Sequence, residues 1–223
     1  GRYIVKEVSS PQYYSVSEEE VTVYLEHEGQ IVQIEFLNES VYTNVSIGKS
    51  GYTEVVPGQE IRYTFKDIAN NSTVPLDSFY WRDTLPTDAV RLDKIITGTY
   101  SARLNYKVVF QTNLSNTQRV LADNLNTLQN YTLDASPAAL GLASNEYVTQ
   151  VTFLFGRVPG GFRQVETPYI YCDVLSDLPH EYRFANKCDV GGMWRNQWIQ
   201  ATDRWVTIIY RGGPVPTLPR TGY

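Results

Sequence analysis

Short segments in which apolar and polar residues alternate recur along this chain, and they limit its fold more than any other feature. Within residues 104–112, Tyr106, Val108 and Phe110 occupy every second position. Successive side chains of a β-strand point to opposite faces of a sheet, so this period of two predicts strands with one buried face. Turn residues interrupt the pattern about every 8 to 12 residues, which is typical of a β-sandwich.

Twelve other segments are predicted to be strands on the same grounds. They are residues 1–7, 21–25, 31–38, 41–47, the two segments of 51–65 on either side of a Pro57-Gly58 turn, 76–82, 118–121, 147–155, 167–175, 181–190 and 205–210. Residues 27–30 are expected to form a hairpin turn that joins 21–25 to 31–38. Residues 135–141 are the one predicted helical turn, with Ser136 as its cap and Gly141 at its end. The expected fold class is therefore all-β, built from antiparallel sandwich modules.

The composition excludes several classes of function. The net charge is −5 and Lys and Arg form no cluster, which argues against a nucleic-acid partner. No apolar run approaches the roughly 18 residues of a membrane span. The two Cys and two His residues form no metal-binding motif, so we expect neither a metal nor a cofactor.

The end of the chain carries a five-residue motif, Leu218, Pro219, Arg220, Thr221 and Gly222. It resembles the LPxTG sorting signal of Gram-positive cell-wall-anchored surface proteins. The resemblance implies that a sortase cleaves after Thr221 and joins its carboxyl group to peptidoglycan. The preceding residues 212–217 are rich in Pro and Gly, and such a spacer is extended and would present the motif to an enzyme. Residues 214–223 are therefore expected to form a tail outside the folded domains.

Residues 1–40 contain Gly-x-Tyr-x-Val-x-Glu at the start and Phe-x-Asn at the end. This segment resembles the C-terminal half of a prealbumin-like CnaB domain, a stalk module of Gram-positive adhesins and pilins. Many such domains carry an isopeptide bond, an amide that joins a Lys amine to an Asn side chain with help from a Glu. The resemblance assigns the assisting role to Glu7 and the acceptor role to Asn38, and it places the Lys upstream of Gly1. The alternative, which we favour for residues 1–40, is a three-stranded amphipathic sheet without a cross-link.

Residues 41–213 are expected to form the main domain. Their ordered motifs Lys-x-Gly, Pro-Gly-x-x-Ile-x-Tyr, Asn-Asn-Ser and Asp-Thr-Leu-Pro resemble the DUF-eleven type of bacterial surface-repeat domain. The resemblance is good over residues 43–90 and loose beyond them. It implies an immunoglobulin-like sandwich that occurs in tandem on Gram-positive cell surfaces.

A second isopeptide site can be drawn within this domain from Lys49, Asp83 and Asn186. Lys49 ends the first strand, Asp83 lies at a strand edge, and Asn186 belongs to a second Phe-x-Asn sequence. A simpler interpretation, which we favour from the sequence, is that Lys49 is a surface lysine, Asp83 caps a turn and Asn186 lies near a loop.

Two further sets of residues are candidates for bonding or binding. If residues 167–175 and 181–190 form a hairpin, Cys172 and Cys188 are cross-strand neighbours and can form a disulfide; two buried thiols are the alternative. Trp194 and Trp198 can offer a surface for stacking on a sugar, although core and rim packing is the simpler interpretation.

These observations favour a structural module over other functions. We expect the wall-proximal stalk of a sortase-anchored bacterial surface protein, an adhesin or pilin-like protein secreted to the cell surface. The alternative is a module that binds a host glycan or protein. The sequence contains none of the common hydrolase, metalloprotease or nucleotide-binding motifs, so we do not expect an enzyme.

Overall fold

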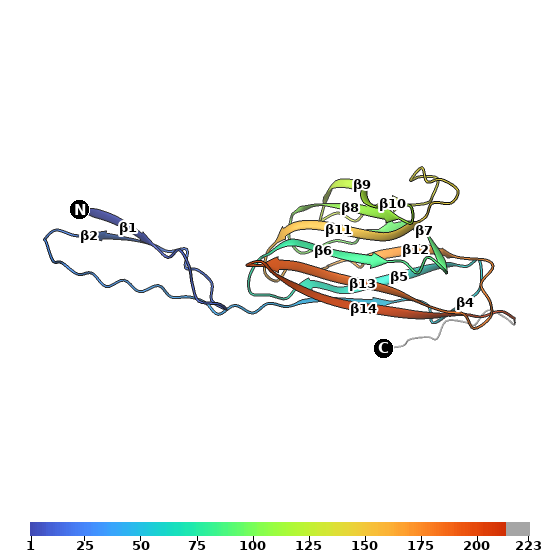
Figure 1. The fold of residues 1–223 in the computed structure, drawn as a ribbon, viewed down its shortest axis with the longest axis horizontal. Coiled ribbons are helices and arrows are strands. Elements are labelled where there is room, and N and C mark those ends of the chain that lie inside the picture. The colour runs from blue at the N-terminus through green and yellow to red at the C-terminus, as the bar shows by residue number, and fades with distance from the viewer. Residues whose placement is uncertain (213–223) are drawn as a thin grey trace. The chain divides into compact units, whose positions relative to one another are not determined.

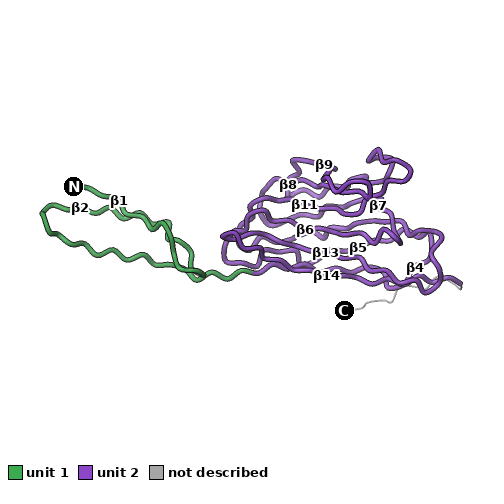
Figure 2. The backbone as a smooth tube through the Cα atoms, in the orientation of Figure 1, with its two compact units in different colours: residues 1–43 green, residues 44–223 purple. Residues whose placement is uncertain are grey.

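The computed structural model describes residues 1–212. The chain divides into two compact units, Gly1–Thr43 and Asn44–Tyr223, which are described separately below (Figure 2). The predicted sorting signal at residues 218–222 lies outside the described residues. Among the described residues, no helix is long and apolar enough to cross a membrane.

The C-terminal unit is a β-sandwich of two sheets, and the predicted all-β fold is confirmed (Figure 1). One sheet has the order β10-β7-β12-β5-β3, formed by Thr132–Asp134, Val90–Ile96, Tyr169–Val174, Glu60–Asn70 and Val45–Ser50. The other has the order β4-β14-β13-β6-β11-β8-β9, formed by Glu54–Val55, Gln197–Ile209, Arg183–Trp194, Leu76–Thr84, Val148–Val158, Asn105–Thr112 and Ser115–Asn126. All pairings are antiparallel except the short parallel contact of β4 with β14.

The core between the two sheets is built by the alternation seen in the sequence. On β6, Phe79, Trp81 and Asp83 are buried while the residues between them are half-buried. Trp81 occupies the centre, where its ring stacks on Phe153 at 3.9 Å and lies 4.8 Å from Phe65. The Trp81 indole donates a hydrogen bond to a buried tyrosine hydroxyl, so the one polar atom of this large side chain is satisfied.

The predicted hairpin between residues 167–175 and 181–190 is wrong. Its first strand, β12, lies between β5 and β7 in the five-stranded sheet. Its second, β13, lies between β14 and β6 in the seven-stranded sheet. The connection therefore crosses from one sheet to the other, and Leu178 within it is buried in the core.

Other local predictions fared better. The Pro57-Gly58 turn is present, and Gly58 has the positive φ of 76° that favours glycine at such a position. The helical turn after residue 135 is also present: Leu140 N–H donates to the Ser136 carbonyl at 3.0 Å, and the Ser136 hydroxyl accepts from Ala139 N–H. Strands β7 and β10 were not anticipated.

The N-terminal unit contains one two-stranded sheet, β1 (Arg2–Lys6) paired with β2 (Glu20–Tyr24). The prediction of a third strand at residues 31–38 is wrong, because this segment is extended but forms no ladder with β2. A gap of about 500 Å³ separates residues 21–24 from residues 32–35. The alternation itself is preserved, since Ile34, Phe36 and Asn38 are half-buried and their neighbours are exposed.

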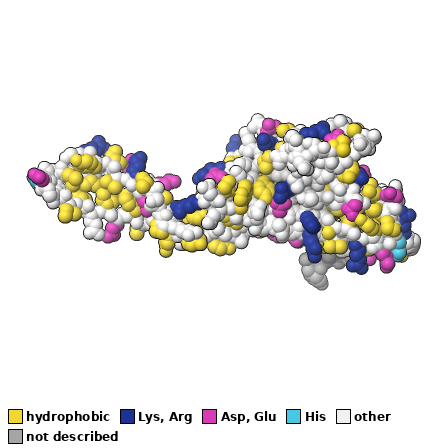
Figure 3. Space-filling view, in the orientation of Figure 1, with side chains coloured by type: hydrophobic (Ala, Val, Ile, Leu, Met, Phe, Trp, Pro, Cys, Tyr) yellow, Lys and Arg dark blue, Asp and Glu magenta, His cyan; other side chains and the backbone are white. Residues whose placement is uncertain are grey.

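The N-terminal unit exposes an unusual amount of apolar surface, visible as yellow side chains in Figure 3. Val8, Ile31 and Leu37 are each about nine-tenths exposed. A sheet of two strands has too little facing material to bury such side chains.

Candidate functional site: a buried lysine, aspartate and asparagine

Lys49 points into the core of the C-terminal unit. It lies on β3, where Val45 and Ile47 are also buried, so it takes a position that the alternation would reserve for an apolar residue. The side chain is fully buried, with an exposed fraction of 0%. A lysine is rarely buried in this way unless a specific partner compensates its charge.

Asp83 is that partner. The Lys49 Nζ donates to Asp83 Oδ1 at 2.6 Å, and the aspartate side chain is also 0% exposed. Burial raises the pKa of the Asp83 carboxyl above its usual range, while the charge and hydrogen bond of Lys49 and the hydrogen bond from Asn186 oppose the rise. The site therefore holds a carboxyl group that takes up a proton more readily than one in water.

Asn186 is the third residue of the site. It lies on β13, which pairs with β6, and it is fully buried. Its Nδ2 donates to Asp83 Oδ2 at 3.3 Å. Lys49 and Asn186 thus hold the two oxygens of one carboxylate, and they come from different sheets of the sandwich.

Aromatic rings surround the lysine amine. Its Nζ lies 3.9 Å from the centre of the Phe65 ring and 4.7 Å from the centre of the Tyr63 ring. The rings exclude water from the site and leave Asp83 as the only acceptor of a hydrogen bond from Nζ among the described residues. Interactions in such a dry environment are stronger than at the surface.

Two buried polar atoms at this site have no hydrogen-bond partner at normal distance, the Asn186 Oδ1 and the Tyr63 hydroxyl. Buried polar atoms in folded proteins are nearly always paired, so unpaired ones call for an explanation. Both belong to side chains of this site, since the Tyr63 ring faces the Lys49 amine and Asn186 binds the carboxylate that holds that amine.

The structure thus corrects our favoured interpretation of these three residues. Lys49 is not a surface lysine, Asp83 does not cap a turn, and Asn186 does not lie near a loop, because all three side chains are buried. The alternative grouping of Lys49, Asp83 and Asn186 is the one that the fold brings together. The sequence did contain a signal for this grouping. Each of the three residues lies two positions from a buried apolar residue on its own strand, so the alternation places its side chain on the buried face.

The two cysteines border this site as free thiols. Cys172 on β12 and Cys188 on β13 lie in different sheets as buried free thiols, which is the alternative to the cross-strand disulfide that the sequence left open. Burial raises the pKa of the Cys188 thiol to about 12, and it raises that of Cys172 well above its usual range. Cys188 lies opposite Asp83 in the register of β13 and β6. Asp83 contributes to raising the pKa of both thiols and Lys49 opposes it, although burial is the main cause.

The N-terminal unit brings together the other predicted pair. Asn38 Nδ2 donates to Glu7 Oε1 at 2.8 Å, and the Ser17 N–H donates to Glu7 Oε2 at 2.6 Å. The Asn38 Oδ1 is buried without a partner. Lys6, the one lysine of residues 1–43, points elsewhere and pairs with Glu20 at 2.5 Å on the surface. Residues 1–43 thus hold an acid and an amide in contact, with no amine beside them.

The two tryptophans considered as a possible sugar-stacking surface differ in their exposure. Trp194 is half-buried and packs against the core, whereas Trp198 is 53% exposed and its ring meets the edge of Tyr80. Next to these rings, Arg82 forms a bidentate ion pair with Asp189, with both distances 2.8 Å. The outer face of the seven-stranded sheet therefore offers an exposed aromatic ring beside a neutralised charge pair.

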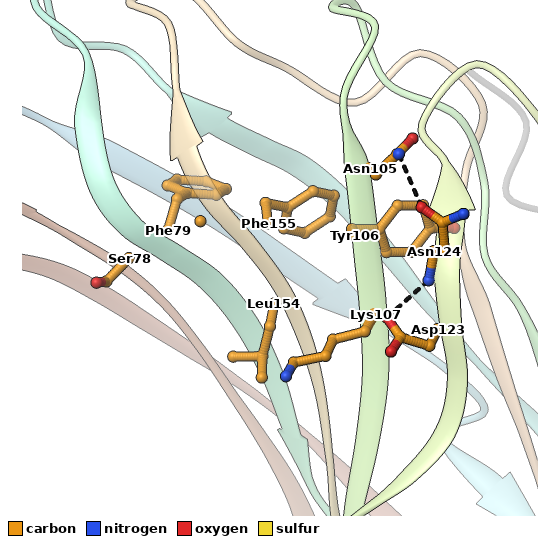
Figure 4. A pocket seen from close by; sticks show the side chains of 10 residues that line it. Ser78, Phe79, Asn105, Tyr106, Lys107, Asp123, Asn124, Leu154 and Phe155 are labelled. Carbon is orange, nitrogen blue, oxygen red and sulfur yellow. Dashed lines mark hydrogen bonds between the residues drawn. The ribbon is translucent and has the colours of Figure 1, made fainter.

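A separate pocket of about 420 Å³ opens at strands β6, β8, β9 and β11 (Figure 4). Phe79, Tyr106 and Phe155 form its apolar wall, and the Asn105 amide donates to Asn124 Oδ1 at its rim. Lys107 and Asp123 are its charged residues. It contains no pairing of a nucleophile with a base.

Comparison with known proteins adds little. No family model and no curated protein matches the chain, so the resemblances to CnaB and DUF-eleven domains stay predictions. Among solved structures, the major pilin subunit BcpA of Bacillus cereus is similar with a TM-score of 0.33 and 14% identity, over 94% of this chain and 54% of the pilin. The chain thus spans about half the length of that subunit.

Two other solved structures have similar scores. The collagen-binding domain of a Staphylococcus aureus adhesin has a TM-score of 0.28 and 10% identity, over 78% of this chain and 99% of that domain. AvmM, which catalyses macrocyclisation in alchivemycin A biosynthesis, has a TM-score of 0.30 and 9% identity, over 87% of this chain and 99% of the enzyme. At this level of similarity the likeness assigns no function.

Proposed function

We propose that this protein is a structural module of a bacterial surface protein, stabilised by an isopeptide bond that forms between Lys49 and Asn186. The observation that supports it best is the fully buried contact of Lys49 with Asp83, which also binds Asn186. An amine, a carboxyl group with a raised pKa and a primary amide are the three groups that the reaction needs.

The reaction can be written with these groups alone. The Lys49 ammonium gives a proton to Asp83, and the neutral amine then attacks Cγ of Asn186. The new C–N bond forms, the bond to Nδ2 breaks, and Nδ2 leaves as ammonia after receiving a proton through the Asp83 carboxyl. Asp83 keeps one proton at the end, in agreement with its raised pKa.

The position of this bond suits a load-bearing role. Lys49 lies on β3, at the edge of the five-stranded sheet, and Asn186 lies on β13 within the seven-stranded sheet. An amide between them joins the first strand of the unit to its last but one and ties the two sheets together. Force applied along the chain would then have to break a covalent bond before the sandwich could open.

A buried ion pair without a bond is the competing explanation. Such pairs add little net stability, because the cost of removing two charges from water offsets their attraction. An ion pair also has no need of the adjoining amide with its unpaired carbonyl oxygen. The reaction accounts for both the buried Lys49–Asp83 contact and the adjoining Asn186 amide, whereas an ion pair accounts only for the contact.

Intact-mass spectrometry of the purified chain tests this proposal. We expect a mass about 17 Da below the sequence mass, because one ammonia leaves. Proteolysis should then yield one branched peptide that contains both Lys49 and Asn186. A mass equal to the sequence mass would refute the bond, and Asn186→Ala provides the matched variant that cannot form it.

The wider role as a wall-proximal stalk is also a proposal. It rests on the resemblance of residues 218–222 to a sorting signal, which would make sortase and peptidoglycan the partners through Thr221. A purified sortase and a glycine-based nucleophile test it, since the chain should be cleaved and joined after Thr221. The Thr221→Ala variant should stay intact.

The Glu7–Asn38 pair extends this proposal to the N-terminal unit. The contact at 2.8 Å places the proposed assisting acid against the proposed acceptor. The amine would have to come from a lysine outside residues 1–43, because Lys6 pairs with Glu20. The exposed apolar side chains of this unit would be covered by the strand that carries that lysine.

Glycan recognition is the second candidate function, and the exposed ring of Trp198 is the observation that favours it. A sugar ring has an apolar face that stacks on such a side chain. Binding to a glycan array that is lost in Trp198→Ala, while Trp194→Ala weakens folding instead, would support this function over a purely structural one.

A further inference from the structure

We infer that the Tyr63 hydroxyl is a catalytic group of the proposed bond-forming site, where it and the Asp83 carboxyl act together as the two donors that stabilise the oxyanion on Asn186. This inference rests on the proposed function and adds a residue to it. Tyr63 is the last residue of the Pro-Gly-x-x-Ile-x-Tyr motif, to which the sequence assigned no chemical role.

The first observation is an unexplained pair of buried atoms. The Tyr63 hydroxyl and Asn186 Oδ1 both lack a hydrogen-bond partner at normal distance. Tyr63 is 1% exposed, so water does not supply the missing partner at the surface. A buried tyrosine hydroxyl normally finds a partner, and a phenylalanine would fit the same apolar position without that cost.

The second observation is that these atoms belong to neighbouring side chains. Tyr63 on β5 faces the Lys49 amine with its ring, and its hydroxyl extends beyond that amine toward β13 and β14. Burial raises the pKa of the Tyr63 hydroxyl, and hydrogen-bonding contacts with Asn186 and Thr207, longer than a normal hydrogen bond, oppose part of that rise. Tyr63 therefore remains protonated and is a donor at neutral pH.

The geometry has a chemical consequence for the amide of Asn186. Its Nδ2 now donates a hydrogen bond to Asp83 Oδ2, so this oxygen acts as the acceptor. Once Asp83 has taken the proton from Lys49, it becomes a donor instead. A half-turn of the amide then brings Oδ1 to the place of Nδ2, between the Asp83 hydroxyl and the Tyr63 hydroxyl.

Two neutral hydroxyl donors in an apolar pocket form an effective oxyanion hole. A tyrosine and a protonated aspartate serve this purpose in ketosteroid isomerase, where the apolar site keeps the acid neutral. Such donors stabilise the tetrahedral intermediate more than the planar amide, since negative charge develops on the oxygen only during attack. The Tyr63 proton is not consumed, so the atom balance of the reaction is unchanged.

The test is the rate at which the full chain loses ammonia. Wild-type chain and variants are made by cell-free synthesis, samples are quenched in denaturant at intervals, and the fraction that has lost about 17 Da is measured by intact mass. Tyr63→Phe keeps the ring over Lys49 and removes the hydroxyl alone. We expect the reaction to slow by about 10²- to 10³-fold, as for loss of one oxyanion-hole donor.

Tyr106→Phe is the matched control, because Tyr106 is buried and its hydroxyl likewise lacks a partner. It packs against Phe153 and Phe155 and has no contact with Lys49 or Asp83 among those described. We expect its rate to equal that of the wild type. If Tyr63→Phe fails to fold, 3-fluorotyrosine placed at position 63 replaces it as the test variant: its hydroxyl is a stronger donor, so the reaction should be as fast as in the wild type or faster.

The outcomes separate this inference from the proposed function. If the wild-type chain never loses ammonia, the bond itself is refuted and the role of Tyr63 with it. If the wild type reacts and Tyr63→Phe reacts equally fast, the bond stands and the role of Tyr63 is refuted. A slower reaction with 3-fluorotyrosine than with tyrosine would likewise overturn it.

Discussion

Lys49 and Asn186 bind opposite oxygens of the Asp83 carboxylate, although they belong to different sheets of the sandwich. This relationship makes Asp83 the centre of the site. It also explains why all three residues must be considered as one group, because removing any of them leaves a buried polar partner unsatisfied.

Asp83→Asn should abolish the bond while it preserves the shape of the site. An amide cannot take up the lysine proton, so the amine stays charged and does not attack. The intact mass should equal the sequence mass of the variant. Asp189→Asn is the control, since it breaks an ion pair with Arg82 on the outer face of the sheet. This variant should still lose one ammonia, which lowers its mass by about 17 Da.

Lys49→Met should destabilise the protein beyond the loss of the bond. It leaves the Asp83 carboxyl buried without its cation, and an uncompensated buried charge costs about 3–5 kcal/mol. The double variant Lys49→Met/Asp83→Leu also lacks the bond but removes the unpaired acid. Urea unfolding should therefore show the double variant to be the more stable of the two, and equal stabilities would contradict this account.

The stability of Lys49→Met should also depend on pH. Burial raises the pKa of Asp83 and Lys49 opposes that rise, so the pKa rises further once Lys49 is removed. The folded state then holds the proton more tightly than the unfolded chain, whose carboxyl titrates at about pH 4. Protonation therefore favours folding in acid, and this contribution is lost as the pH increases toward the raised pKa of the folded state.

Unfolding free energies at pH 4 and pH 7 provide the measurement. Lys49→Met is compared with Lys49→Met/Asp83→Asn, which lacks the titrating carboxyl. The unfolding free energy of Lys49→Met, relative to that of the double variant, should be higher at pH 4 than at pH 7. The comparison between the two variants cancels the titration of all other residues. A difference that stays constant with pH would show that Asp83 is not a buried acid in the folded protein.

Both cysteines should be unreactive in the folded protein and reactive after unfolding. Thiol reagents attack the thiolate, and burial raises the pKa of Cys188 to about 12 and that of Cys172 well above its normal range. Mass spectrometry at pH 8 should show no alkylation of the native chain and two additions in denaturant. A single mass about 2 Da lower, with no alkylation in denaturant, would reveal a disulfide instead.

The sequence determined the strands and the direction in which their side chains point. The alternation on β3, β6 and β13 already placed Lys49, Asp83 and Asn186 in phase with buried residues. Phase is a local property, because it follows from the geometry of a single strand. A charged residue at a core position was therefore a detectable anomaly, and reading it as surface or loop was the error.

Only the tertiary structure decided which strands are neighbours. β12 and β13 follow one another in the chain and have good turn residues between them, yet each pairs within a different sheet. Residues 31–38 have the pattern of a strand but no ladder with β2. Pairing depends on contacts between segments far apart in sequence, and the same pairing that separated Cys172 from Cys188 brought Lys49 and Asn186 to one carboxylate.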